Sequence, residues 1–302
     1  MRHFLAALTF IIPLGAHAAV PVIEGDVDPA QLLEWVKTQK AIPANLKLSG
    51  SKGFCMKCSD ENSQYTGEPS TVPLYQTGTT TSGATFFEAD MDVDCDGSKN
   101  GPCNASKDPS HQPELSCGCN ADAGKLPFFV IPLGSRFNAG SRGIELGAIA
   151  ACIYKDPKTG KVGMMYGPWL DEDGVSQEIG EASAYMAQQL GVDPNPETGG
   201  SDTGNTYIVF PGPDGRLSGN DRLDHAKAVA AGVAAAKKLL AAFPVSARVR
   251  LEPAKVSRGG AWFPGRGKIR LEGTARSEGW FGMNGARLRL DPTERFPDPP
   301  RR

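Results

Sequence analysis

The chain has 302 residues, 40% of them hydrophobic, and a formal net charge of −2. After residue 18 no stretch is apolar enough to cross a bilayer as a helix, which excludes a membrane-spanning helix in that part of the chain. The small net charge hides an asymmetry: residues 248–302 hold 13 Lys and Arg against 6 Asp and Glu, so residues 19–247 carry a net charge of −10. An acidic body attracts a cationic substrate, although it also serves solubility.

The first residues have the pattern of an export signal. Arg2 and His3 precede an apolar run, residues 4–14, and Ala16-His17-Ala18 provides a cleavage site of the A-x-A kind. We expect cleavage after Ala18, with an uncleaved anchor as the alternative, and no Cys follows that would suggest a lipoprotein. The remaining 284 residues are enough for one good domain core or two modest ones.

The next elements are a short helix and a loop-rich region. Asp28 followed by Pro29 predicts a helix start, and the apolar residues from Leu32 to Val36 give it one packing face. Residues 49–82 are rich in Gly, Ser, Thr and Cys, so they predict loops held by disulfide bonds.

Seven cysteines in an exported chain predict disulfides rather than metal binding. Six lie before Lys125 and allow 15 pairings, whereas Cys152 lies in an apolar run and is expected to be the buried odd thiol. The spacings do not match a zinc ribbon, and His111 is the only histidine nearby. The six are Cys55, Cys58, Cys95, Cys103, Cys117 and Cys119.

Four aspartates then alternate along one predicted strand: Asp90, Asp92, Asp94 and Asp96. Alternation places them on one side of the strand. The pattern resembles the start of an EF-hand loop, but Cys103 occupies the position where Glu is required, so that interpretation fails and only a looser calcium site stays open. Crowded carboxylates need a compensating cation, and a row of substrate ammonium groups is one. For Asp96, beside Gly97, a turn-capping role is favoured.

Short apolar strands follow. Residues 128–131 predict one strand, and residues 143–154 and 162–170 predict a hairpin around the turn 155–160. Residues 207–210 predict a closing strand after the polar loop 193–200.

Between the hairpin and that closing strand lies the central stretch, residues 163–191. It predicts a buried strand, an acidic turn that begins at Asp171, and a short helix that starts at Glu181 and ends at Gly191. Two carboxylates held near one cleft, Asp171 at a strand end and Glu181 at a helix start, are what hydrolysis of a glycosidic bond requires.

The last part of the chain divides at about residue 245. Residues 218–221 have the pattern of a capping box and precede a helix rich in Ala that extends to about Phe243. Beyond it the chain is rich in Gly and Arg, which fits a small β appendage, a wall-binding arm or disorder. We therefore expect a signal peptide (1–18), a helix with Cys-rich loops (19–82), a catalytic domain with a packing helix (83–245) and a basic extension (246–302).

Several blocks in this order resemble glycoside hydrolase family 75, the fungal-type endo-chitosanases. They are Ala89–Gly97, Leu126–Pro132, Tyr166-Gly-x-x-x-Asp171-x-x-Gly174, Ile179-Gly-Glu-Ala-Ser183, Ala187–Pro194, Gly199-Gly200 and Thr206–Phe210. The resemblance covers roughly residues 79–212. It implies an inverting mechanism in which Asp171 and Glu181 are the essential pair, separated by about 6.5–9.5 Å.

Asp171 is crowded by Glu172 and Asp173, which departs from the family pattern, so a shift in register would give Asp173 the role instead. For Glu181 the structural alternative is a helix-capping carboxylate. A helix start favours Glu181 as the base, whereas neighbouring carboxylates favour Asp171 as the acid, and burial of Glu181 would reverse that order.

Substrate binding is expected at four further residues. Asp92 and Asp94 suit glucosamine ammonium groups, and Tyr166 and Trp169 suit stacking on sugar rings, although aromatic residues in a strand more often belong to the core. We expect no metal and no organic cofactor. The expected partner is chitosan or a related cationic polysaccharide, with no nucleic acid, no membrane span and a monomeric state.

The short strands and Gly-rich turns predict a mainly β fold, a small six-stranded double-psi-like β-barrel with a few packed helices, the barrel type being taken by analogy. The function we expect is that of an endo-chitosanase exported to the medium or a periplasm. The alternatives are a hydrolase of another glycan such as peptidoglycan and a non-catalytic glycan-binding module. A Ser-His-Asp hydrolase is disfavoured, because neither His111 nor His225 lies in a nucleophile motif.

Overall fold

The computed structural model describes residues 21–49, 54–56, 70–98, 103, 112–132, 137–173 and 178–243 of a first compact unit, Met1–Val245. In a second unit, Ser246–Arg302, it describes residues 249–251, 269–271, 280–283 and 286–289. The expected signal peptide and its cleavage site lie outside the described residues.

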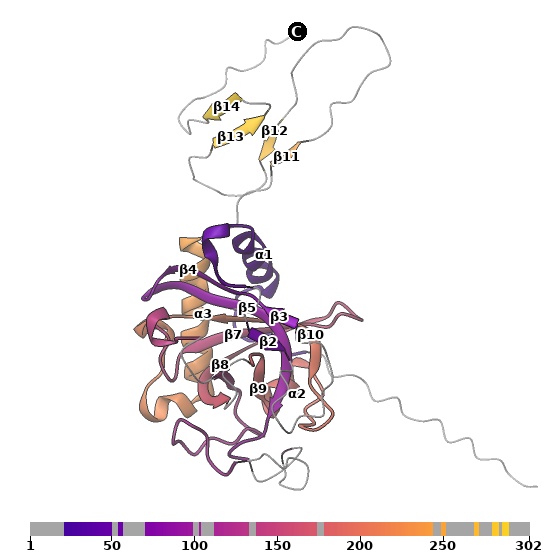
Figure 1. Cartoon of the computed structure of the whole chain (residues 1–302), viewed down its shortest axis with the longest axis vertical. Helices are drawn as coiled ribbons and strands as arrows, with labels where there is room; N and C mark the ends of the chain where they lie inside the picture. The colour runs from indigo at the N-terminus through magenta and orange to yellow at the C-terminus, as the bar shows by residue number, and fades with distance from the viewer. Residues whose placement is uncertain are drawn as a thin grey trace, which may run out of the picture. The chain divides into compact units, whose positions relative to one another are not determined.

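The first unit is mainly β, as expected, and its centre is an eight-stranded sheet (Figure 1). The strands pair in the order β1-β4-β5-β10-β7-β8-β6-β9, and β9 also pairs with β5. Six strands, from β5 round to β9, therefore form a closed circuit of pairings. The eight are β1 (Leu46–Leu48), β4 (Leu74–Thr79), β5 (Ser82–Asp94), β6 (Phe129–Pro132), β7 (Ile149–Lys155), β8 (Val162–Asp173), β9 (Glu181–Ser183) and β10 (Ser201–Val209).

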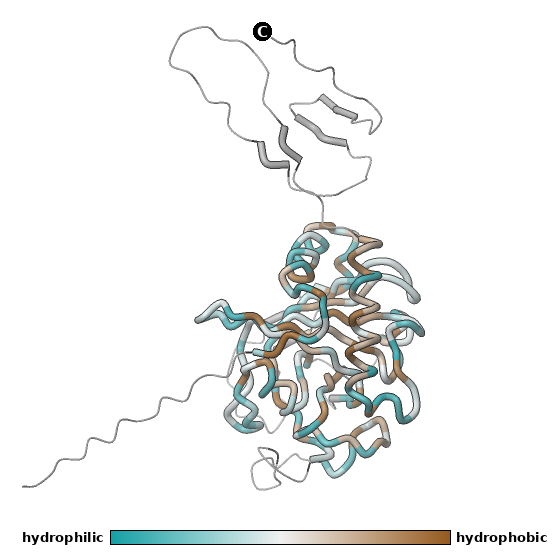
Figure 2. Tube along the Cα trace, turned by 180° about the vertical axis from the view of Figure 1, so that it is seen from behind, coloured by the Kyte–Doolittle hydropathy of each residue, from teal (hydrophilic) through white to brown (hydrophobic). Residues whose placement is uncertain are grey.

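Alternation along these strands separates two apolar cores. One face of the circuit contributes residues such as Phe87, Cys152 and Tyr207 to a core enclosed by the strands. The opposite face contributes Phe86 and Tyr166 to a second core, which the helices α1 (Pro29–Lys40) and α3 (His225–Ala242) complete. Figure 2 shows the hydrophobic residues concentrated on the inner strands and along one helix, with hydrophilic residues on the turns.

Several sequence predictions are confirmed. Asp28 caps α1 through a hydrogen bond from the Ala30 amide (2.9 Å), with Pro29 at the first position. β7 and β8 form the predicted hairpin. Cys152 is a buried free thiol. Cys95 is bonded to Cys103 and Cys117 to Cys119, whereas Cys58 lies outside the described residues.

Three local predictions are wrong. Residues 74–79 form strand β4 rather than a loop, because they pair with the start of β5 across a tight turn. The helix α2 (Ala184–Leu190) begins three residues after Glu181, with Ser183 as its cap, and Glu181 belongs to β9. The Ser218 side chain makes no cap hydrogen bond; Asp224 caps α3 instead, accepting from the Lys227 amide.

Further pieces of secondary structure are small. β2 (Phe54–Met56) pairs with β3 (Ser70–Val72). In the second unit, β11 (Val249–Leu251) pairs with β12 (Ile269–Leu271), and β13 (Trp280–Met283) with β14 (Ala286–Arg289). Within the described residues no helix combines the length and the apolar character needed to span a bilayer.

The contact between α3 and β8 is tightest at Gly232, where an added Cβ atom would lie 2.2 Å from a ring carbon of Tyr166. Helix propensity alone would make Gly232→Ala stabilising by about 1 kcal/mol. Because the buried ring has no space to retreat, we expect the substitution to lower the free energy of unfolding by about 1–3 kcal/mol.

Urea unfolding measures this effect, with Ala234→Gly on the exposed side of α3 as the control for propensity. The control should lose about 1 kcal/mol. A Gly232→Ala variant more stable than the wild type would contradict the packing described.

Candidate functional site

The strand β9 brings Glu181 beside Asp92. It pairs in parallel with β5, so that Asp92 lies opposite Glu181 and Asp94 opposite Ser183. On its other side β9 is antiparallel to β6, with Ala182 opposite Phe129. A three-residue strand between two neighbours has little freedom, so the position of Glu181 is fixed by pairing on both sides.

Asp171 reaches the same region from β8. It lies within the strand, two residues before its end, because β6 and β8 pair in parallel with Val130 opposite Asp171. The predicted acidic turn is therefore partly strand. Continuing the β6–β9 register by one residue places Glu181 beside Val130, so the two carboxylate residues flank Val130. Two strand spacings put their backbones about 9.5 Å apart.

A bulge decides which way Asp171 points. The β6–β8 register shifts between Phe129 and Val130, and β8 gains one residue there. Leu170 and Asp171 consequently both reach the outer face, where Leu170 and Val130 belong to one small core under residues 112–124. Bulges of this kind often re-aim a side chain next to an active site.

One oxygen of Asp171 is held by three donors. Its Oδ1 accepts hydrogen bonds from the Ser116 amide (2.8 Å), the Ser116 hydroxyl (2.5 Å) and the Glu172 amide (2.8 Å). Its Oδ2 is buried and accepts none from the part of the chain that the structure describes. The residue as a whole is 4% exposed. Asp171 is therefore oriented through Oδ1, whereas Oδ2 is buried and accepts no hydrogen bond from the described residues.

Asp171 also belongs to a cluster of three carboxylates. Oxygen atoms of Asp94, Asp96 and Asp171 lie within 4.8 Å of one another, close enough for one cation to contact all three. Asp94 accepts from the Asp96 amide (2.6 Å), and Asp96 accepts from the Gln112 amide (2.7 Å). The carboxylate of Asp94 caps the turn by accepting from the amide two residues on, whereas the Asp96 carboxylate binds the amide of Gln112, 16 residues away. These contacts show how the strand end and the following loop gather the acids.

Tyr207 holds the residue before Glu181 in place. Its hydroxyl donates to the carbonyl of Gly180 (2.7 Å), which also accepts from the Asp92 amide (3.1 Å). Burial, together with the negative charge of nearby groups including Asp90, Asp92 and Glu181, holds the pKa of Tyr207 well above its usual value. Tyr207 lies in a block of the resemblance, but no sequence pattern indicates this contact with the turn before Glu181.

The two aromatic residues expected at the substrate lie in the core. Tyr166 is fully buried against α3, and this placement leaves no ring face for a sugar. Trp169 is 8% exposed and its indole nitrogen donates to the backbone carbonyl of Asp171 (2.7 Å). Trp169 therefore holds the backbone of Asp171 from the inner core. Ser116 was not anticipated, because a serine in a Cys-rich loop carries no signal of its contact.

Of the other expected residues, Asp92 and Glu181 are partly exposed and Asp94 is buried. Asp92 lines a cavity of about 390 Å³ that also includes Tyr154 and Gly200. The side chain of Asp173, the alternative to Asp171, lies outside the described residues.

Comparison with known proteins gives a family match and two similar relatives. Residues 91–238 match the family described as fungal chitosanase of glycosyl hydrolase group 75, so the resemblance predicted from the sequence is confirmed. The chain is 41% identical over 135 residues to "Endo-chitosanase C" of Aspergillus oryzae (strain ATCC 42149 / RIB 40), and 38% identical over 134 residues to "Endo-chitosanase C" of Aspergillus oryzae. Each match covers 43% of this chain, and the chain spans about a third of the length of these relatives (33% and 32%).

Two buried groups at the centre of the first unit predict a pH dependence. Burial holds the pKa of the Cys152 thiol above its usual 9.0 and that of the Tyr207 phenol above 10.0. Above these values the unfolded chain releases protons that the folded chain keeps, so stability falls as the pH rises. We expect a loss of about 1.4 kcal/mol per pH unit for each group once its unfolded pKa is passed.

Urea unfolding at pH 8 to 11 checks this, with Cys152→Ala as the comparison. That variant should lose the part of the slope that begins near pH 9 and keep the part that begins near pH 10. Equal slopes for the two proteins would show that the thiol does not contribute.

Proposed function

We propose, on the premise that residues 91–238 of this chain carry a group 75 glycosyl hydrolase segment, that the protein is a secreted endo-chitosanase. It hydrolyses β-1,4 linkages between glucosamine residues with inversion, and Asp171 and Glu181 are its catalytic residues. The observation that carries the proposal is the row Glu181, Val130, Asp171 across three neighbouring strands.

The spacing of this row supports an inverting mechanism. An inverting hydrolase needs its two carboxyl groups about 6.5–9.5 Å apart, which leaves room for a water molecule beside the sugar. Backbones two strands apart, about 9.5 Å, suit side chains at that separation. A retaining enzyme needs about 5–5.5 Å, which neighbouring strands would provide more readily.

The surroundings of the two carboxylates suggest their roles. Asp171, through Oδ2, gives a proton to the glycosidic oxygen as the bond from that oxygen to the anomeric carbon breaks. Glu181 is partly exposed and takes a proton from a water molecule, whose oxygen bonds to the same carbon from the opposite face. The base has to be the residue that water reaches, which favours Glu181. This assignment replaces the argument from a helix start, because Glu181 lies on a strand.

Asp171 is covered in the described arrangement, so substrate has to displace part of its cover. Ser116, which donates to Oδ1 of the same carboxylate, is part of that cover, and it is itself exposed and lies between Leu115 and the Cys117–Cys119 bridge. A thin cover of this kind can shift when substrate binds, and hydrogen bonds of catalytic groups often change between free and bound enzyme.

The substrate is recognised by charge. Asp92 lies directly opposite Glu181, and Asp94 follows on the same side of β5. Both suit the ammonium group of a glucosamine unit bound next to the cleaved bond. Residues 19–247, with a net charge of −10, attract the polycation toward them.

We infer further that the closed circuit of six strands is a double-psi-like barrel, since β9 is parallel to β5 and β6 is parallel to β8. Export to the medium or a periplasm rests on the signal pattern of residues 1–18 and fits the disulfides. The proposed segments are 1–18, 19–82, 83–245 and 246–302, and the protein is proposed to act as a monomer.

A non-catalytic glycan-binding module is the second candidate. The buried Oδ2 of Asp171 favours it, because a binding module has no need of an accessible acid. Sugar release separates the two functions, and a panel of chitosan, N-acetylated chitin and peptidoglycan separates chitosanase activity from action on another glycan.

Removing either carboxylate tests the catalytic pair. We expect Glu181→Gln and Asp171→Asn each to lower kcat on chitosan by about 10²–10⁴-fold, because each takes away one proton-transfer group. Reducing-end release by the purified protein is the measurement.

The matched controls are Glu172→Gln and Asp173→Asn, which change the neighbouring acids of the same strand end. Both should keep kcat within severalfold of the wild type. A collapse in Asp173→Asn with normal activity in Asp171→Asn would move the role to Asp173.

The stereochemistry of the product is a separate test. Inversion at a β-1,4 linkage gives an α reducing end, which mutarotation then converts to the mixture. Proton NMR in the first minutes of hydrolysis should show the α anomer in excess. An initial excess of the β anomer would rule out the inverting mechanism but would not contradict chitosan as the substrate.

A further inference from the structure

The strand β10 leaves its partner β5 just beyond the candidate site. Ser201 lies opposite Met91 and Asn205 opposite Ala89, so four residues of β10 span two residues of β5. Asp202, Thr203 and Gly204 therefore bulge outward from the pairing. A bulge of this size opens space between strands instead of filling it.

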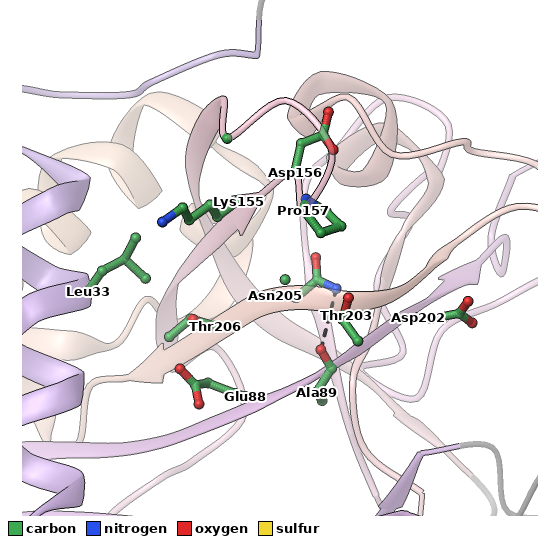
Figure 3. A pocket seen from close by; sticks show the side chains of 12 residues that line it. Leu33, Glu88, Ala89, Lys155, Asp156, Pro157, Asp202, Thr203, Asn205 and Thr206 are labelled. Atoms are coloured by element: carbon green, nitrogen blue, oxygen red, sulfur yellow. Dashed lines mark hydrogen bonds between the residues drawn. The ribbon is translucent and has the colours of Figure 1, made fainter.

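Two adjoining cavities occupy this space. One, of about 480 Å³, contains Glu88 and Asn205; the other, of about 390 Å³, contains Asp92 and Gly200. Asp202, Thr203 and Pro157 line both, so the two form one groove, which we call the β10 groove. Figure 3 shows its first part, with the turn after β7 on one side and β5 on the other.

The groove is a built feature of the backbone. Gly204 has φ +96°, and a Cβ atom there would lie 2.5 Å from the carbonyl oxygen of Lys155. The bulge can thus approach the β7–β8 turn only with glycine at this position. The turn itself is held by Asp156, which accepts from the Thr159 hydroxyl (2.5 Å) and the Lys158 amide (2.8 Å).

The floor of the groove offers an acceptor. The Asn205 amide nitrogen donates to the Ser201 hydroxyl (2.7 Å) and to the Ala89 carbonyl (3.5 Å), which fixes the direction of its oxygen. That oxygen is buried and accepts no hydrogen bond from the described residues. A buried acceptor of this kind suits a donor brought by a ligand.

The groove is acidic on the side next to Glu181, whereas at its far end the negative charge is balanced by a cation. Asp92 and Asp202 lie on the side next to Glu181, and Asp202 is exposed. Glu88, at the far end, is paired with Lys40. Figure 3 shows the Lys155 side chain directed toward Leu33, whereas the Asp202 carboxylate lies at the other end of the view. Among the described residues that line the Asp202 side, Lys158 is the one cation.

We propose that the β10 groove binds the chitosan chain beyond the cleaved bond, with Asp202 accepting the ammonium group of a glucosamine unit and Thr203 and Asn205 contacting its hydroxyl groups. The inference rests on the proposed function and deepens it. The groove starts at Asp92, opposite Glu181. Because Ser201 and Thr206 lie opposite Met91 and Glu88, this part of β10 extends about 10 Å along β5, enough for more than one sugar ring. Such a groove explains cleavage within a chain rather than at its end.

Binding of a glucosamine hexamer tests the groove without cleavage when it is measured by calorimetry in a Glu181→Gln background. We expect Asp202→Asn to weaken binding by about two- to fivefold at low salt, as removal of one exposed charge pair allows. Lys158→Gln should strengthen binding by a similar factor, because it removes the cation beside Asp202.

Asp214→Asn is the matched control: this exposed acid pairs with Lys238 outside the groove, and its loss should leave the affinity unchanged. Thr203→Lys, which adds a cation to the groove, should weaken binding by more than Asp202→Asn. Equal affinities for the Asp202 and Asp214 variants, or no hexamer binding at all, would overturn the proposal.

The outcome is separable from that of the proposed function. If the wild type cleaves chitosan but the variants do not show the predicted order of affinities for the hexamer, the groove proposal fails and the proposed function stands. If the wild type releases no sugar while the order of affinities holds, the groove is supported and the hydrolase is not.

Discussion

The placement of Glu181 depends on the turn at Gly180. Its carbonyl accepts from the Tyr207 hydroxyl and from the Asp92 amide, which ties the turn to β10 and β5 at once. Its φ of +121° is open to glycine, and a Cβ atom would lie 2.7 Å from a carboxylate oxygen of Asp90. From this turn the chain enters β9 in the register that puts Asp92 opposite Glu181. Asp92 and Glu181 are neighbours because of that register, although 88 residues separate them in sequence.

Parallel pairing has a chemical consequence here. In a parallel pair, residues opposite each other project to the same face, so Asp92 stands beside Glu181 and Asp94 beside Ser183. Ser183 uses its hydroxyl to cap α2 and to bond residues 126 and 128, which locks β9 against β6. The rigid part of the site is therefore a backbone framework of short strands. Asp171, by contrast, is contacted by a loop residue, the exposed Ser116, through two hydrogen bonds.

Local patterns made much of the fold predictable. Asp28 before Pro29, the β7–β8 hairpin and the odd thiol Cys152 all follow from residues close in sequence or from counting. The candidate pair came from the resemblance and from the spacing of carboxylates around a predicted turn. What could not be predicted is long-range pairing. The sequence around Glu181 has the pattern of a helix start, but the backbone pairs with β5 at Asp92, so Glu181 lies in strand β9. Tertiary pairing here overrides a weak local preference.

The same distinction explains why the two aromatic residues expected at the substrate lie in the core. An aromatic residue in a strand alternates with its neighbours, and alternation does not say which face a helix will cover. Tyr166 faces α3, where Gly232 lets the helix lie against its ring, whereas Trp169 faces the inner core. Recognition in the proposed enzyme then falls to acids and amides at the ends and bulges of strands. That division suits a substrate whose charge is its distinguishing property, because ammonium groups are bound by carboxylates and carbonyl oxygens rather than by apolar ring faces alone.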